Sequence, residues 1–270
     1  MFQTLLDIYY TWKDDCIHNS WRIRSINSFC SGLVFMFHNV TDNYVDTIES
    51  CKCKITEFKN ILNLYEKRGY KFVSVEEALS IIRNRDRTKF VVVTFDDIPD
   101  NVYTNAYPIL KARKIPFTVF IAVNLIDTDG FVSMEHLKEM SRDYLCTVGA
   151  HTMSHPFLRK SKEIEWEIRN SRIILESLLN VDVKYFAYPF GRSSSVSKKV
   201  IKCVRKAEFE CAFSSISAPL SDSSLNTPYF LPRIVPDFSK EYTNKFSFDA
   251  LRTIMFYCVR PIKVLLNYRK

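Results

Sequence analysis

The amino-acid sequence predicts an α/β fold, namely a single-domain, distorted (β/α) barrel of about seven to eight parallel strands. Two observations predict it. Strand-like and helix-like segments alternate from about Leu33 onward, and such alternation is typical of parallel βαβ units. Eight strand candidates can be counted, and this number favours a barrel over an open sheet.

The predicted strands are short, mainly apolar runs. They cover residues 33–37, 71–73, 89–95, 117–122, 145–150, 184–188, 210–214 and 230–235. Residues 193–197 and 217–228 are predicted to be loops, because serine and other turn-forming residues are frequent there. The second loop is long enough to flank a cleft.

Helix starts are predicted from side chains that can accept a hydrogen bond from the first helical turn. Ser74 and Glu77 form a capping-box pattern, and Gly69 is typical of the end of the preceding helix. The predicted cap residues are Thr56 for the helix that ends at Gly69, Ser74, Asp100 for 102–114, and Ser161 for a run through Leu179.

Length and composition indicate an ordinary globular protein, with 270 residues, 47% of them hydrophobic and 25% charged. The barrel is predicted over 32–240, between an N-terminal extension (1–31) and a basic amphipathic C-terminal segment (241–270). Over residues 245–270, six basic residues and one acidic residue alternate with apolar ones, which suits a membrane surface. A terminal helix packed on the barrel fits the same pattern.

The expected compartment is the cytoplasm, with peripheral contact to a membrane as a further expectation. The first 15 residues lack the pattern of a signal peptide, and no stretch reaches the ~20 apolar residues of a membrane span. The eight cysteines form no Cys-x-x-Cys pair, which favours a reduced protein. Despite the net charge of +8, no nucleic-acid-binding module is recognised, and no phosphate-binding glycine motif is present.

Two adjacent carboxylates, Asp96 and Asp97, follow the predicted strand 89–95. Neighbouring residues of a regular strand point to opposite faces, so both can serve one site only if the strand ends there. Pro99 indicates that it does. Two like charges held together need a cation, a shared proton or different roles. A helix cap with a solvated neighbour is the simpler alternative.

A histidine pair, His151 and His155, follows the predicted strand 145–150. With one carboxylate, two histidines make a metal site that keeps open positions. This spacing also occurs by chance on surface helices, but together with the aspartates it favours a metal-dependent hydrolase. In a barrel, the residues that follow strands gather on one face, and His38 and residues 189–191 also follow predicted strands.

Three motifs in order resemble the polysaccharide deacetylases with a NodB-like domain, carbohydrate esterase family 4. They are TFDD at 94–97, HTMSHP at 151–156 and FAYPFG at 186–191, and the similarity runs from about Leu33 to Val235. The resemblance implies a distorted (β/α) barrel that removes N- or O-acetyl groups from sugars. It also implies a divalent metal, commonly zinc, with cobalt, nickel or manganese as alternatives.

The resemblance further implies residue roles. The metal ligands would be Asp97, His151 and His155. Asp96 would be the general base, which takes a proton from the attacking water. The oxyanion and substrate positions would be Tyr188, Pro189 and Phe190, with the backbone N–H of Phe190 holding the oxyanion.

The chain departs from the family pattern at three places. No histidine follows His155, so the late histidine that protonates the leaving group in many members is missing. Residues 35–40 resemble an early histidine element of the poly-N-acetylglucosamine deacetylase subgroup, which implies that His38 is the acid. Ile98 replaces the glycine after the aspartates, and we expect it to reshape this loop. Ala187 replaces an arginine, and Arg233 is predicted to orient the base instead.

The leading hypothesis is a metal-dependent enzyme that removes N-acetyl groups from N-acetylhexosamine units. Its substrate would be an acetylated polysaccharide, oligosaccharide or lipid-linked glycan precursor. One alternative is a catalytically inactive carbohydrate-binding homologue, which Ile98 and the missing late histidine favour. Another is a metal-dependent hydrolase of a different small amide or ester.

Overall fold

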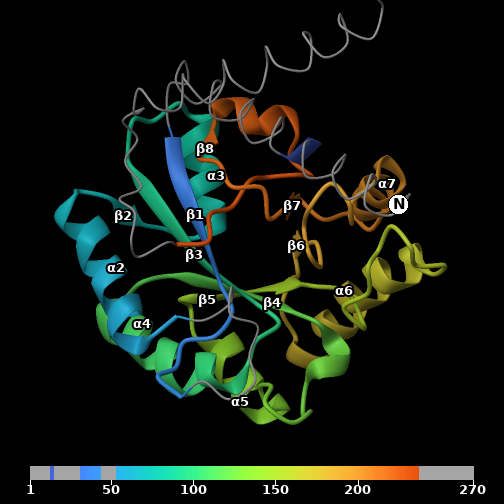
Figure 1. Cartoon of the computed structure of the whole chain (residues 1–270), viewed down its shortest axis with the longest axis horizontal. Helices are drawn as coiled ribbons and strands as arrows, with labels where there is room; N and C mark the ends of the chain where they lie inside the picture. The colour runs from blue at the N-terminus through green and yellow to red at the C-terminus, as the bar shows by residue number, and fades with distance from the viewer. Residues whose placement is uncertain (1–12, 15–30, 44–52, 237–270) are drawn as a thin grey trace, which may run out of the picture. The chain divides into compact units, whose positions relative to one another are not determined.

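A single curved sheet of eight strands forms the centre of the protein (Figure 1). The computed structural model describes residues 13–14, 31–43 and 53–236. Along the sheet the strands follow the order β7-β6-β5-β4-β3-β1-β8, and β2 pairs with β3. The strands are β1 (Ser31–Phe37), β2 (Lys71–Phe72), β3 (Phe90–Asp96), β4 (Phe117–Ile121), β5 (Cys146–Ala150), β6 (Tyr185–Ala187), β7 (Cys211–Phe213) and β8 (Leu220–Ser221).

Neighbouring strands from β1 to β7 are parallel, and only β8 runs antiparallel, beside β1. The α/β barrel predicted from the sequence is therefore confirmed. β8 lies inside the predicted loop 217–228 and was not foreseen, because a strand of two residues carries no alternating pattern.

A segment after β8 links β7, at one end of the sheet, to β1, next to the other end. Leu231 forms an isolated parallel bridge with Phe213 of β7, and Ile234 forms another with Phe35 of β1. The predicted strand 230–235 is thus reduced to two bridges. Pro232 stands between them and has no N–H for a ladder. This closing segment brings residue 233 into the barrel interior.

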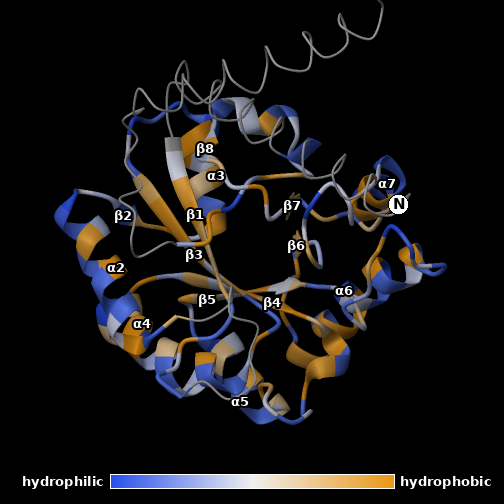
Figure 2. Cartoon of the chain, viewed as in Figure 1, coloured by the Kyte–Doolittle hydropathy of each residue, from blue (hydrophilic) through white to orange (hydrophobic). Residues whose placement is uncertain are grey.

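Helices cover the outside of the sheet (Figure 1). Their apolar sides face the strands, as the colours in Figure 2 show, and this burial is their main source of stability. The α-helices are α2 (Ile55–Lys67), α3 (Val75–Arg83), α4 (Tyr107–Arg113), α5 (Met134–Arg142), α6 (Ile164–Leu179) and α7 (Lys198–Lys206). A π-helical turn, η2 (Val102–Ala106), and two 3-10 helices, η3 (Val123–Leu125) and η4 (Asp222–Asn226), complete the described helices.

The predicted caps agree with the structure in part. Ser74 caps α3 through its side chain, which accepts a hydrogen bond from the Glu77 N–H at 3.1 Å. Thr56 was the wrong cap for α2, because the helix begins at Ile55 and Lys54 is its N-cap. Ser161 accepts a hydrogen bond from the Glu163 N–H at 3.1 Å, but α6 begins only after Glu163.

Aromatic rings fill the core between β1, β3 and α2. Phe37 lies edge-on to Phe58 with 5.1 Å between ring centroids, and Phe95 packs against both. All three side chains are buried. Each buried phenylalanine stabilises the fold by roughly 1.5–3 kcal/mol relative to an exposed one. This core fixes the strands whose ends carry the polar residues described below.

The predicted extension (1–31) and the basic C-terminal segment (241–270) lie almost entirely outside the described residues. The domain boundaries, and membrane contact through the C-terminal segment, therefore stay predictions. Among the described residues, no helix combines the length and the apolar character that a membrane span requires.

Candidate metal centre and catalytic site

The chain turns sharply where β3 ends, and the two neighbouring carboxylates at this turn have different partners. Asp96 is the last residue of the strand, and Asp97 and Ile98 follow with φ angles of +62° and +51°. The Ile98 N–H donates a hydrogen bond to the Asp96 carbonyl at 2.7 Å. Left-handed backbone is unusual for isoleucine, so Ile98 adopts the conformation that glycine would favour. Its side chain is fully buried.

Asp97, His151 and His155 lie together at the carboxyl ends of β3 and β5. The Asp97 Oδ1 atom is 3.5 Å from His151 Nε2 and 3.3 Å from His155 Nε2. His151 Nδ1 is 2.7 Å from the Ala187 carbonyl oxygen. A carbonyl only accepts, so Nδ1 carries the proton and Nε2 presents a lone pair toward Asp97. Burial lowers the pKa of His151, which favours the neutral imidazole that metals bind.

This cluster fits a divalent cation. Asp97 Oδ1 is buried and has no hydrogen-bond partner among the described residues. A buried carboxylate oxygen without a partner is costly, and here it faces the lone pair of His151. A cation between these atoms would satisfy them at once. Two imidazoles and one carboxylate are a ligand set for zinc and related metals, with positions left open for water or substrate.

Arg233 occupies both oxygens of the Asp96 carboxylate. Its Nη1 donates to Oδ1 at 2.7 Å and its Nη2 to Oδ2 at 2.6 Å, and both residues are buried. The arginine is itself fixed, because its Nε donates to the Ser214 carbonyl at 3.0 Å. Burial has the largest single effect and raises the pKa of Asp96, but the charge and hydrogen bonds of Arg233, together with the charges of His151 and His38, outweigh it, and the pKa falls to about 2. Asp96 is therefore an ionised, firmly oriented carboxylate.

His38 lies near the carboxylate oxygen of Asp97 that the histidine pair does not face. It follows β1, and its Nε2 is 4.0 Å from Asp97 Oδ2, whereas His151 and His155 face Oδ1. Its side chain is 19% exposed, so solvent or substrate can reach it. The structure thus places His38 beside Asp97, but not among the groups that face Asp97 Oδ1.

Two asparagines that the sequence analysis missed hold the backbone after His38. Asn101 Oδ1 accepts a hydrogen bond from the Val40 N–H at 2.8 Å, and Asn105 Nδ2 donates to the Val40 carbonyl at 2.9 Å. Asn105 lies in the π-helical turn η2, a type of turn that is frequent at functional sites. No pattern in the sequence marks such long-range pairs.

Residues 188–191 form the rim next to the histidine pair. The Tyr188 hydroxyl is buried and donates to the Tyr229 carbonyl at 2.7 Å, so it points into the protein. Phe190 has a φ of +62°, is 53% exposed, and its ring lies 4.9 Å from that of His155. Its N–H donates no hydrogen bond to any described residue. Gly191 is required, since a Cβ there would lie 2.4 Å from the Ser215 nitrogen.

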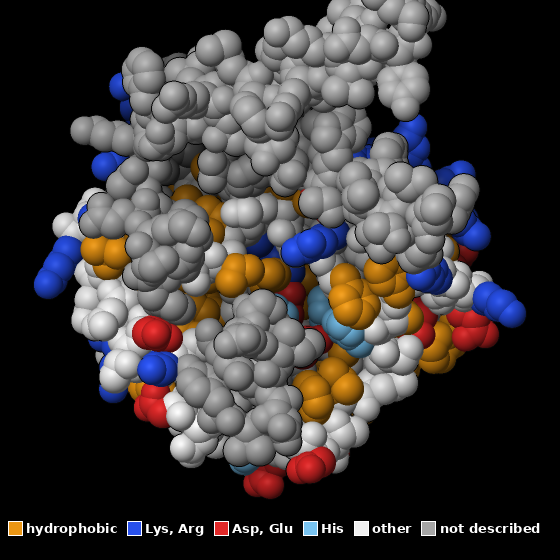
Figure 3. Space-filling model, viewed as in Figure 1, with side chains coloured by type: hydrophobic (Ala, Val, Ile, Leu, Met, Phe, Trp, Pro, Cys, Tyr) orange, Lys and Arg blue, Asp and Glu red, His pale blue; other side chains and the backbone are white. Residues whose placement is uncertain are grey.

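The surface around this rim is partly apolar. Figure 3 shows hydrophobic side chains next to the histidines, with acidic and basic groups nearby. The Phe157 ring lies 5.7 Å from that of Phe190 and carries the Lys160 ammonium 5.2 Å above it. Exposed aromatic rings beside a polar centre are typical of ligand sites.

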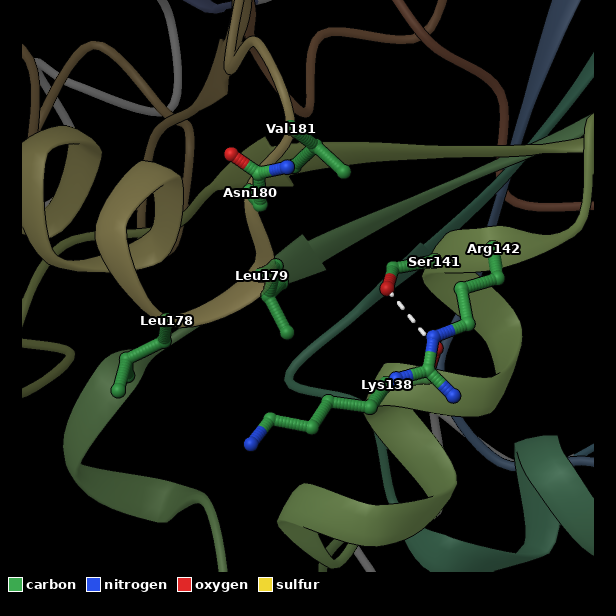
Figure 4. A pocket seen from close by; sticks show the side chains of 7 residues that line it. All are labelled: Lys138, Ser141, Arg142, Leu178, Leu179, Asn180 and Val181. Carbon is green, nitrogen blue, oxygen red and sulfur yellow. Dashed lines mark hydrogen bonds between the residues drawn. The ribbon is translucent and has the colours of Figure 1, made fainter.

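A surface pocket of about 520 Å³ lies elsewhere, between the C-terminal ends of α5 and α6 (Figure 4). Its lining residues are Lys138, Ser141, Arg142, Leu178, Leu179, Asn180 and Val181. The Ser141 hydroxyl donates to the Lys138 carbonyl at 3.0 Å. None of the predicted site residues lines this pocket, and it contains no acid or histidine for catalysis.

Residues 83–212 of this chain match the family model described as polysaccharide deacetylase. A poly-beta-1,6-N-acetyl-D-glucosamine N-deacetylase of Staphylococcus aureus (strain MRSA252) is 27% identical over 234 residues, which cover 80% of this chain and 77% of the relative. The family match includes Asp96, Asp97 and both histidines, whereas His38 and Arg233 lie outside it.

Solved structures show the same architecture. IcaB from Ammonifex degensii superposes with a TM-score of 0.66 at 27% identity, and the alignment covers 77% of this chain and 92% of that one. A polysaccharide deacetylase from Bacillus cereus superposes with a TM-score of 0.68 at 24% identity. That alignment covers 76% of this chain but only 64% of the Bacillus cereus chain.

Proposed function

We propose that the chain is a member of the polysaccharide deacetylase family and acts as a metal-dependent hydrolase of N-acetylated glycans. It would remove acetyl groups from N-acetylhexosamine units of a polysaccharide, an oligosaccharide or a lipid-linked precursor. The observation that carries the proposal is the buried Asp97 Oδ1, which faces two imidazole nitrogens and lacks a hydrogen-bond partner among the described residues.

The metal would be held by Asp97, His151 and His155, and the ligand set favours zinc, with cobalt, nickel or manganese as alternatives. When bound, such an ion lowers the pKa of a water molecule and polarises the acetyl carbonyl. The hydrogen bond between His151 and the Ala187 carbonyl, 2.7 Å long, would fix the orientation of that ligand.

Asp96 would accept the proton of the attacking water. It is ionised, because its pKa is about 2, and Arg233 fixes the plane of its carboxylate through two hydrogen bonds. Each carboxylate oxygen has a second lone pair, so the ion pair leaves Asp96 able to accept a further hydrogen bond or a proton. The backbone N–H of Phe190 would donate to the oxyanion that develops on the acetyl group.

His38 would donate a proton to the leaving nitrogen of the sugar. An amide nitrogen leaves as an amine only after protonation, so the reaction needs an acid on the far side of the acetyl group from the base. The position of His38 near Oδ2 of Asp97, away from the histidine pair, supports this role.

The proposal is tested by acetate release from a panel of N-acetylated saccharides of increasing length. We expect release that a chelator abolishes and added zinc restores. Saccharide binding without acetate release, with metal present, would show an inactive carbohydrate-binding homologue. Metal-dependent hydrolysis of simple amides or esters alone would show a different hydrolase.

A further inference from the structure

Glu167 is a buried acidic residue that lies outside the proposed catalytic groups. It stands in the first turn of α6 and is 6% exposed. A buried carboxylate is expensive unless it is hydrogen-bonded. Among the described residues, no ion pair includes Glu167. Its partners must therefore compensate for its burial.

All three hydrogen bonds that its carboxylate accepts come from the loop that joins the two predicted histidine ligands. Glu167 Oε2 accepts from the Met153 N–H at 3.0 Å and from the Ser154 N–H at 3.0 Å. Its Oε1 accepts from the Ser154 hydroxyl at 2.5 Å. Hydrogen bonds to an ionised acceptor are roughly twice as strong as neutral ones, so one side chain fixes the middle of the loop between His151 and His155.

The backbone of this loop is strained, so the loop depends on these hydrogen bonds to keep its conformation. Thr152 and His155 have φ angles of +74° and +53°. Left-handed non-glycine residues cost roughly 1–3 kcal/mol each and persist only where their surroundings hold them. On the other side of the loop, the Thr152 and Met153 carbonyls accept hydrogen bonds from η3, at 3.1 and 2.8 Å. Thus η3 binds the loop carbonyls and Glu167 binds the loop N–H groups.

We propose that Glu167 is a positioning residue for the metal, which acts by holding the His151–His155 loop in the conformation that points both imidazoles at Asp97. This inference rests on the proposed metal site. Residues that hold the metal ligands in place, without binding the metal themselves, usually contribute about 10–100-fold to the metal affinity. Loss of Glu167 should therefore weaken metal binding without removing a ligand.

The test measures zinc affinity and the metal-induced rise in melting temperature of the full chain. Glu167→Ala should bind zinc about 10–100-fold more weakly, and its melting temperature should rise less on zinc addition. Glu167→Gln keeps an acceptor but loses the charge, so it should show an intermediate loss. The absorption spectrum of bound cobalt should also change in Glu167→Ala, because it reports the ligand geometry.

Two controls separate positioning from simple loss of stability. Glu165→Ala changes an exposed acid in the same turn of α6, whose carboxylate lies 3.9 Å from Lys206. Leu175→Ala empties a fully buried position of the same helix and destabilises the fold without removing any of the three hydrogen bonds to the loop. Both should keep the zinc affinity and cobalt spectrum of the wild type. If Glu167→Ala fails to fold, Glu167→Gln and Ser154→Ala, which removes one of the three hydrogen bonds, decide the question.

The outcomes are distinguishable. If the wild type binds no metal, and Asp97→Asn therefore changes nothing, the proposed function itself fails. If the wild type binds zinc and Asp97→Asn does not, but Glu167→Ala or its substitutes bind as tightly as Leu175→Ala, then only the positioning role is overturned.

Discussion

Arg233 binds both carboxylate oxygens of Asp96 from a position 137 residues further along the chain. The two residues meet because residues 231–234 join β7 to β1, which brings the arginine inside the barrel, between the rings of Phe120 and Phe213. Both charges are buried, so each is stabilised mainly by the other. Residue 187 is an alanine, and the closing segment supplies the cation for Asp96.

Arg233→Lys should lower kcat by about 100-fold, because a lysine ammonium cannot hold both carboxylate oxygens and a small misplacement of a catalytic group costs that much. Zinc affinity should stay unchanged, since Arg233 does not contact the proposed ligands. Steady-state kinetics and zinc titration measure both effects. Arg205→Lys, at an exposed arginine, is the control, and an equal loss of kcat in both variants would contradict the prediction.

The same ion pair should make stability depend on pH. Asp96 has a pKa of about 2 in the folded protein, compared with about 3.9 for an ordinary aspartate. A lowered pKa stabilises the folded state fully above the unfolded value, and this contribution is lost as the pH falls through about 2. It amounts to about 2–3 kcal/mol. In urea unfolding of metal-free protein, the difference in free energy of unfolding between wild type and Asp96→Asn should decrease from about pH 5 to pH 2. A difference that does not change with pH would contradict the lowered pKa of Asp96.

Asp96 and Asp97 should differ in what they lose on conversion to asparagine. Asp96→Asn removes the proposed base but no ligand, so we expect loss of acetate release with nearly unchanged zinc binding. Asp97→Asn removes the oxygen that faces both histidines, so zinc binding should fall as well. Equilibrium dialysis with zinc, together with acetate release, separates the two. Equal loss of metal in both variants would show that the roles are wrongly assigned.

The sequence predicted the barrel because most strands are short apolar runs between amphipathic helices, and such local patterns survive in the fold. It also predicted which residues gather on one face, since the carboxyl ends of parallel strands share one edge. The predicted strand 230–235 is reduced to two bridges because Pro232 has no N–H for a ladder, and β8 was not predicted because a strand of two residues carries no alternating pattern. Pairs such as Asn105 with Val40 depend on contacts between segments that are distant in the sequence, and no local sequence pattern predicts them.

Ile98 combines a left-handed backbone with a fully buried side chain. Its φ is +51°, which glycine adopts more readily than isoleucine, and its side chain is 0% exposed. Ile98→Gly should relieve roughly 1–2 kcal/mol of backbone strain, but it should lose roughly 2–5 kcal/mol of packing. We therefore expect a net loss of stability in urea unfolding with catalysis largely kept. A more stable variant would mean that strain outweighs packing here.

His38→Ala tests the assignment of the general acid. An amine leaves only when protonated, whereas the leaving group of an activated ester needs no proton, so the loss of rate should be much larger on N-acetyl sugars. General acid catalysis typically contributes about 10²–10⁴-fold, and the difference between the two substrates should approach this range. His136→Ala is the matched control, because His136 is a half-buried histidine that contacts Asp100 and stacks on Tyr103 instead of facing Asp97. Equal losses of His38→Ala on both substrates would make His38 structural, and the acid would have to be another group near Asp97.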